Sequence, residues 1–199
     1  MLNALWQNPT YRFLILFLGL FTFLYYLNIA VIGLVAPGGY YVPFVAKYLD
    51  YINGLRYGLM ESTAFLLRQL GEQVFTKNDW MRVAGRGGFI MAYDCLGFGV
   101  MSFFTAFVIA YPKSVKSKAI FLPAGLLLIQ CLNIIRFVLL GLFWKHSNLK
   151  ELINHHDVFN IILYLMLMVV IYFWVNIKSE TPEDTVRKQL ESTTSILQN

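Results

Sequence analysis

Four long apolar runs constrain this chain more than any other feature of its sequence. They cover residues 13–35, 93–111, 119–144 and 158–177. The hydrocarbon core of a membrane is about 30 Å thick, and a helix of about 20 residues crosses it. The sequence therefore predicts an all-α membrane protein built on a bundle of about four transmembrane helices.

The composition supports this fold class. Of the 199 residues, 58% are hydrophobic and 14% are charged, whereas a soluble domain carries about 25% charged residues. Residues 1–177 are expected to form a single membrane-embedded domain, and residues 178–199 a polar cytoplasmic tail. The first run exceeds the apolar region of a signal peptide, about 7–15 residues, and is interpreted as an uncleaved span. Basic and aromatic residues do not interleave as in nucleic-acid-binding proteins, so no nucleic acid partner is expected.

The long loop at residues 36–92 differs in character from the spans. Residues 44–73 mix apolar with charged side chains, which is typical of an amphipathic helix lying on or against a membrane. Further on, Gly85, Gly87 and Gly88 separate two short runs rich in β-forming residues. This pattern predicts a small β-hairpin in the same loop.

Lysines in a short loop predict the orientation of the bundle. Lys113, Lys116 and Lys118 lie between the second and third spans, and basic residues in short loops mark the cytoplasmic side. Four spans then place both termini in the cytoplasm, while residues 36–92 and 145–157 face outward. We expect a multi-pass protein of the cytoplasmic (inner) membrane.

Three chemically reactive side chains are expected at one depth. Cys95 opens the second span and His156 precedes the fourth, so both lie at the outer boundary. Arg136 lies 17 positions after Ala119, or about 26 Å along a helix that rises about 1.5 Å per residue. A thiol, a guanidinium and an imidazole therefore reach the outer face from three separate helices.

Among these residues, Arg136 has the highest free energy cost of insertion into the membrane. A charge within a span costs at least about 2.5–3.5 kcal/mol, and such residues are usually paired and functional. Gln130, Asn133 and Arg136 are spaced three apart, so they share one side of the helix. The alternative is a structural arginine that reaches the outer headgroups with help from Asn133.

The two cysteines are interpreted differently. Cys95 stands at a span boundary beside Asp94 and Gly97, where a nearby arginine and a helix N-terminus would favour the nucleophilic thiolate. A small apolar filler is the alternative. Cys131 points about 140° away from Arg136, at about 100° per residue, and is interpreted as a packing residue. A disulfide between the two is not expected.

The histidines leave more than one interpretation. His156 is preferred over His155 because Asn160, four positions on, would share its helical face. An ordinary interfacial histidine is the alternative. His155, His156 and Asp157, with His146 nearby, also permit a metal site, although no helical i, i+4 histidine pair supports one.

Taken in order, three motifs resemble the exosortase/archaeosortase family. They are Cys95 with a glycine two positions on, Asn133-x-x-Arg136 late in the next span, and His156 to Asn160 opening the following one. The resemblance covers about residues 74–177, and the chain is similar to a short form with the four-span core. The family consists of membrane-embedded, cysteine transpeptidase-like enzymes. Their substrates carry a C-terminal sorting signal: a short motif, a transmembrane helix and a basic cluster.

The resemblance implies roles for individual residues. Cys95 is implied as the nucleophile, Arg136 as the transition-state stabiliser and His156 as the acid/base. The residues that would support them are Asp94, Asn133, His155 and Asn160. No cofactor or metal is required, the partners are membrane-anchored substrate proteins and the lipid bilayer, and the oligomeric state stays open. Two other classes stay open: a non-catalytic membrane partner in a secretion or polysaccharide assembly, and a metal-dependent hydrolase using the histidine cluster.

Overall fold

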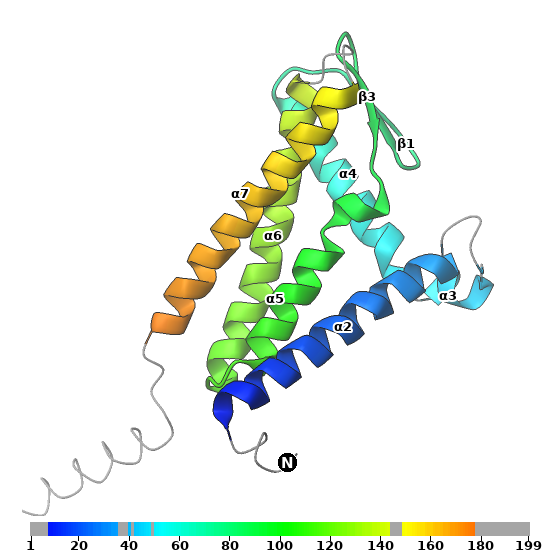
Figure 1. Cartoon of the computed structure of the whole chain (residues 1–199). Helices are drawn as coiled ribbons and strands as arrows, with labels where there is room; N and C mark the ends of the chain where they lie inside the picture. Colours follow the sequence, from blue (N-terminus) through cyan, green and yellow to red (C-terminus); the bar gives the residue numbers. More distant parts are fainter. Residues whose placement is uncertain (1–7, 36–39, 41, 49, 144–148, 178–199) are drawn as a thin grey trace, which may run out of the picture.

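Long helices form the body of the molecule. The computed structural model describes residues 8–35, 40, 42–48, 50–143 and 149–177, without the side chains of residues 149–160. The helices of the bundle are α2 (Pro9–Val35), α5 (Phe98–Ala110), α6 (Val115–Phe143) and α7 (Leu149–Asn176). The start of α2, the end of α7 and the α5–α6 turn lie at one end of the bundle, and a small sheet lies at the other (Figure 1).

Length and hydropathy confirm a helical membrane protein. Among the described residues, three helical segments are long and apolar enough to cross a bilayer: Pro9–Val35, Tyr93–Ala110 and Val115–Phe143. The part of α7 whose side chains are described, Ile161–Asn176, is a shorter apolar helix. The first and third spans each begin four residues earlier than the apolar runs predict, because polar first turns still adopt helical backbone.

The apolar run predicts that the second span is one continuous helix, but the structure divides it into two parts. It opens with a 3-10 turn, η1 (Tyr93–Leu96), and α5 begins only at Phe98. Between them Gly97 adopts the left-handed conformation, with φ +79°, which interrupts any right-handed helix. The α-helical part therefore has only 13 residues, and the residues before it form a separate turn.

The predicted amphipathic helix is present as α4 (Tyr51–Gln69), preceded by the short α3 (Pro43–Tyr48). The Asp50 carboxylate caps α4 by accepting the Asn53 backbone N–H at 2.9 Å. Its buried side includes Ile52, Leu59 and Leu67, which belong to one core with residues of the sheet and α6. Protein, rather than membrane, therefore covers that side of the helix.

The sheet has three strands, where the sequence predicted two. They are β1 (Val74–Lys77), β2 (Trp80–Val83) and β3 (Gly87–Ile90), in an antiparallel order β1-β2-β3. The predicted hairpin is β2–β3. The additional strand, β1, is joined to β2 by a tight turn in which Asn78 has φ +55°. Asparagine tolerates this conformation, so the turn contains no glycine that would have marked it in the sequence.

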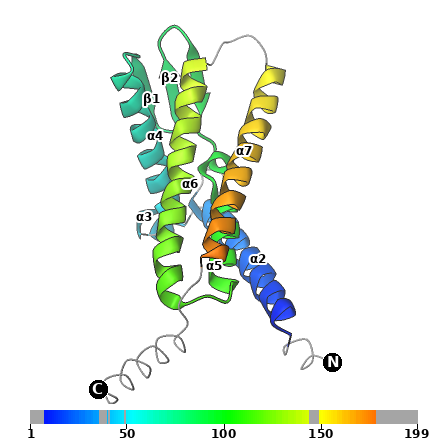
Figure 2. The same ribbon diagram turned by 90° about the vertical axis from the view of Figure 1, so that its left-hand side faces the viewer.

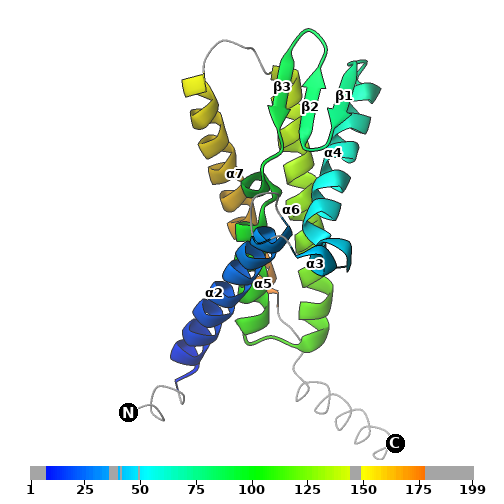
Figure 3. The ribbon, with the colours of Figure 1, turned by 90° about the vertical axis from the view of Figure 1, so that its right-hand side faces the viewer.

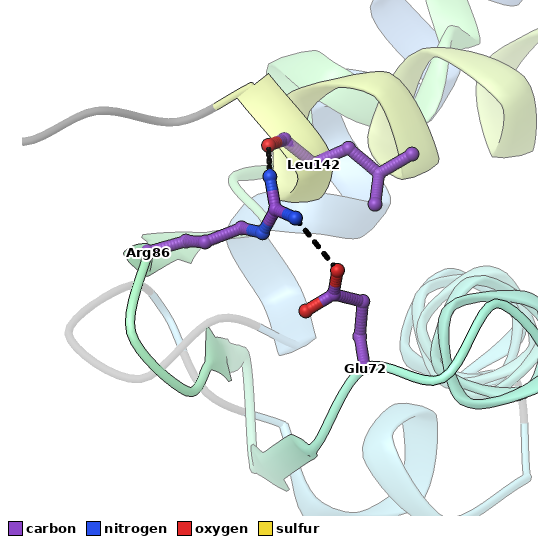
Figure 4. Close-up of polar contacts among 3 residues, drawn as sticks. All are labelled: Glu72, Arg86 and Leu142. Carbon is purple, nitrogen blue, oxygen red and sulfur yellow. Dashed lines mark hydrogen bonds and ion pairs between the residues drawn. The ribbon is translucent and has the colours of Figure 1, made fainter.

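One side of the sheet packs on the helices. Met81, Val83 and Phe89 alternate inward and are buried, and the Phe89 ring stacks on Phe137 of α6 at 6.0 Å between centroids. Arg86 fastens the tip of the sheet by pairing with Glu72 at 2.7 Å and donating to the Leu142 carbonyl near the end of α6 (Figure 4). The sheet is thus fixed to α6 just beyond Arg136.

Polar and aromatic contacts fix α2 against α5. Asn28 Nδ2 donates to Ser102 Oγ at 3.2 Å, and the Tyr51 hydroxyl donates to Asn28 Oδ1 at 2.6 Å. Burial raises the pKa of Tyr51, so the phenol stays a donor. Nearer the other end, Phe17 meets Phe103 edge to face at 5.3 Å.

The end of α7 is held by the α5–α6 turn. Trp174 stacks on Phe121 with 4.4 Å between ring centroids, and its indole N–H donates to Ser117 Oγ at 3.0 Å. Lys113 Nζ donates to the carbonyls of Trp174 and, at 2.9 Å, Ile177. In Figure 2 α6 and α7 lie close at this end and diverge toward the other.

Candidate active site

A cysteine and an arginine from two helical segments meet near the sheet end of the bundle. Arg136 Nη2 donates to Cys95 Sγ at 3.7 Å. Arg136 is only 9% exposed, and its guanidinium carbon lies 5.6 Å from the centre of the Phe137 ring. The expected common depth of these two residues agrees with this contact. The arginine is buried against the thiol and does not extend outward as a headgroup-seeking arginine would.

The turn that carries Cys95 is fixed by its own backbone. The Cys95 N–H donates to the Ala92 carbonyl at 3.0 Å, which closes the 3-10 turn. Gly97 then joins the turn to α5 in a left-handed conformation. A Cβ atom at Gly97 would lie 2.8 Å from Asn133 Nδ2, so only glycine lets η1 approach α6 this closely.

Two amides of α6 hold the carbonyl that follows the cysteine. Gln130 Nε2 and Asn133 Nδ2 each reach Leu96 O at 3.4 Å. Asn133 also donates to Gln130 Oε1 at 3.2 Å and is 2% exposed. The polar stripe predicted on α6 therefore faces the cysteine turn, with two members positioning its backbone and the third contacting the thiol.

One part of the site was not predicted from the sequence. The Arg56 guanidinium carbon of α4 lies 4.9 Å from the centre of the Tyr93 ring, at the start of η1. Arg56 also donates to Asn53 Oδ1. The Tyr93 hydroxyl is buried and has no hydrogen-bond partner within the described part of the chain. The sequence does not indicate that Arg56 contacts Tyr93, because this contact depends on how α4 packs against η1.

Other predicted site residues lie apart or outside the described side chains. Asp94 is exposed, and no described residue bonds to its carboxylate. His155, His156 and Asn160 lie on the first part of α7, but their side chains, and all of His146, are outside the described residues.

The remaining cysteine and the metal alternative take no part in the described site. Cys131, interpreted as a packing residue, is instead exposed on α6, and both cysteines are free. Within the described residues, no three His, Cys, Asp or Glu side chains gather as a metal site. The residues of the metal alternative, His146, His155, His156 and Asp157, fall outside the described side chains.

Fold and site together define a class: a multi-pass helical membrane protein that holds a thiol against a buried guanidinium at the start of a span. The chain matches the transmembrane exosortase model over residues 4–173 and belongs to that family. No curated protein and no solved structure matches it.

Proposed function

We propose that this protein is a membrane-embedded cysteine transpeptidase or protease that cleaves the C-terminal sorting signal of exported proteins just outside the membrane. The observation that carries the proposal is the contact of Cys95 Sγ with Arg136 Nη2 at 3.7 Å. A buried cation in contact with the sulfur can stabilise the negative charge that develops when the sulfur attacks a carbonyl. Membership of the exosortase family supports a sorting reaction in the membrane.

The first step forms a thioester. The Cys95 sulfur attacks the scissile carbonyl, and the developing oxyanion is stabilised by Arg136; the loss of one such donor commonly costs about 10²–10³ in rate. As the C–N bond breaks, the leaving amine takes a proton. His156, which lies on α7 and not before it as the sequence predicted, is the proposed donor, and it takes this proton from the Cys95 thiol during the attack.

The second step regenerates the thiol. An amine, a hydroxyl or water attacks the thioester carbonyl, His156 takes the proton of the attacking group, and the Cys95 sulfur leaves and receives that proton. Transfer to an amine or hydroxyl is transpeptidation or esterification, and transfer to water is hydrolysis. Both outcomes use the same three residues and need no cofactor.

The proposed placement in the membrane follows from the ends of the bundle. Lys113, Lys116 and Lys118 lie at the α5–α6 turn, the end that also holds the start of α2 and the end of α7 (Figure 1). With that end in the cytoplasm, the sheet and the cysteine turn lie toward the outer face of the inner membrane. A substrate helix would leave the hydrocarbon core at this level, where its scissile peptide emerges.

The test is the processing of a membrane-anchored precursor in the native host. Cys95→Ala, Arg136→Ala and His156→Ala should each cause the precursor to accumulate, whereas Cys131→Ala, the matched thiol control, should process it normally. If all three variants are stably expressed and still process every candidate substrate, the proposal is wrong. Normal processing by Cys95→Ala alone would favour a non-catalytic partner or, with chelator sensitivity, a metal-dependent hydrolase.

A further inference from the structure

The two edges of the small sheet differ in what covers them. Helix α4 covers the β1 edge: Arg68 Nη2 donates to Val74 O at 3.4 Å, and Thr76 Oγ1 donates to Glu61 Oε1 at 3.3 Å. At the β3 edge, no hydrogen bond from the described part of the chain reaches the strand from outside the sheet. Figure 3 shows β1 beside α4, and β3 on the side of the sheet toward α7.

The register shows which backbone groups that edge presents. The Met91 N–H donates to the Asp79 carbonyl at 2.7 Å, directly across the ladder. Hydrogen-bonded pairs recur at every second residue of an antiparallel ladder, so Phe89 and Gly87 also bond toward β2. The N–H and C=O groups of Gly88 and Ile90, between them, point away from the sheet.

The side chains of β3 itself do not block this edge. Natural edge strands are usually blocked by a charge, a proline or a bulge, and the sequence of β3, Gly-Gly-Phe-Ile, contains no charge and no proline. The Trp80 ring lies over Gly88 on one face of the sheet, 3.0 Å from where a Cβ would be, but Gly88 has no side chain of its own and Ile90 is 63% exposed. A second strand can therefore approach the outward groups directly.

The β3 edge, which no hydrogen bond from the described residues reaches, leads directly to the cysteine turn. After Ile90 the chain stays extended through Ala92, at φ −67° and ψ 156°, and enters η1, which carries Cys95. A peptide paired with β3 would therefore have one end beside the turn that presents the thiol. The covered β1 edge offers no comparable path, since β2 and β3 separate it from that turn.

We propose that the β3 edge binds an extended segment of the substrate, next to its scissile bond, as a fourth strand of the sheet. This inference rests on the proposed function, whose substrate it describes. Gly88 and Ile90 supply up to four main-chain groups, and strand addition of this kind gives affinity through backbone bonds and selectivity through alternate side chains. The substrate's own transmembrane helix would hold the rest of the molecule in the bilayer.

The first test removes one outward donor. Ile90→Pro deletes an N–H that points away from β2, so the ladder of the sheet is kept. Relative to Ile90→Ala, it should slow processing of an exported host protein with a C-terminal sorting signal by roughly tenfold, the upper range for one hydrogen bond. Thr76→Pro, which deletes an outward donor on β1, is the matched control and should process this protein at the wild-type rate. Alkylation of Cys95 by a maleimide should stay equal in all variants.

The second test detects binding of the precursor at the β3 edge in a variant that lacks the proposed nucleophile. A benzophenone side chain at position 90 of the Cys95→Ala protein should crosslink to residues flanking the cleavage site of the same precursor, and one at position 76 should not. Equal processing by Ile90→Pro and Ile90→Ala, without a crosslink from position 90, would overturn the edge proposal and leave the Cys95 chemistry standing. A crosslink from position 90 with normal processing by Cys95→Ala would support the edge proposal and overturn the chemistry.

Discussion

Arg136 Nη2 lies 3.7 Å from Cys95 Sγ, although 41 positions separate the two residues. The contact depends on the break before α5. Because Gly97 ends the 3-10 turn in a left-handed conformation, the thiol stands on a separate turn and faces the polar stripe of α6. A continuous helix through residues 93–110 would have no such turn to carry the cysteine.

The guanidinium should control the reactivity of the thiol. We expect Arg136→Gln to slow alkylation of Cys95 by a maleimide by about tenfold, because the transition state of the reaction loses a charged donor that contacts the sulfur. The alkylation rate of Arg136→Lys should lie between those of the wild type and Arg136→Gln, since lysine keeps the charge without the planar donor group. The rates are measured in a Cys131→Ser background, because Cys131 is exposed. Equal rates in all three proteins would contradict a functional contact.

Gly97 should tolerate no side chain. Gly97→Ala places a Cβ at φ +79°, 2.8 Å from Asn133 Nδ2, and that amide cannot move without losing its bond to Leu96 O. We expect it to lower the free energy of unfolding by roughly 1–3 kcal/mol and to impair processing. Gly99→Ala is the control, because the nearest atom to its Cβ would be 3.9 Å away. Thermal unfolding in detergent compares the two, and equal stabilities would refute the prediction.

The two amides on Leu96 O should act as a coupled pair. Gln130→Ala and Asn133→Ala each leave the carbonyl one donor, and each also removes the bond between the two amides, which the double variant loses only once. The double variant leaves the carbonyl without either donor, which costs about 1–3 kcal/mol. A double-mutant cycle on unfolding should therefore give a coupling energy of about 0.5 kcal/mol or more. Strict additivity would show that the amides do not share the carbonyl.

The spans and the stripe could be predicted because they depend on periodicity along one helix. Long apolar runs give the spans, and the spacing of three places Gln130, Asn133 and Arg136 on one side wherever that helix packs. Counting residues from a span boundary gives depth, which placed Cys95 and Arg136 at one level. Each of these predictions needs only the local geometry of the chain.

The parts that could not be predicted depend on packing between elements. The Arg56–Tyr93 contact exists because α4 packs beside η1, and no pattern in either segment specifies that neighbour. The left-handed conformation of Gly97 follows from the close approach of Asn133, which lies on another helix. The third strand was missed because its turn uses Asn78 in place of the glycine that usually marks positive φ.

The contact of Lys113 with the end of α7 should stabilise the fold, whereas a neighbouring lysine without this contact should not. Lys113 donates to the carbonyls of Trp174 and Ile177 and lies 4.6 Å from the centre of the Trp174 ring. A cation at a helix C-terminus contributes roughly 0.3–1 kcal/mol. We therefore expect Lys113→Met to lower the free energy of unfolding by about 1 kcal/mol.

Lys116→Met is the matched control for that variant. Lys116 lies in the same short stretch, is exposed, and has no partner among the described residues, so its removal should leave stability unchanged. Both variants reduce the local positive charge by one, and therefore affect the orientation signal equally. Thermal unfolding in detergent measures the difference. If the two variants unfold at the same temperature, Lys113 acts through its charge in the loop and not through its contact with α7.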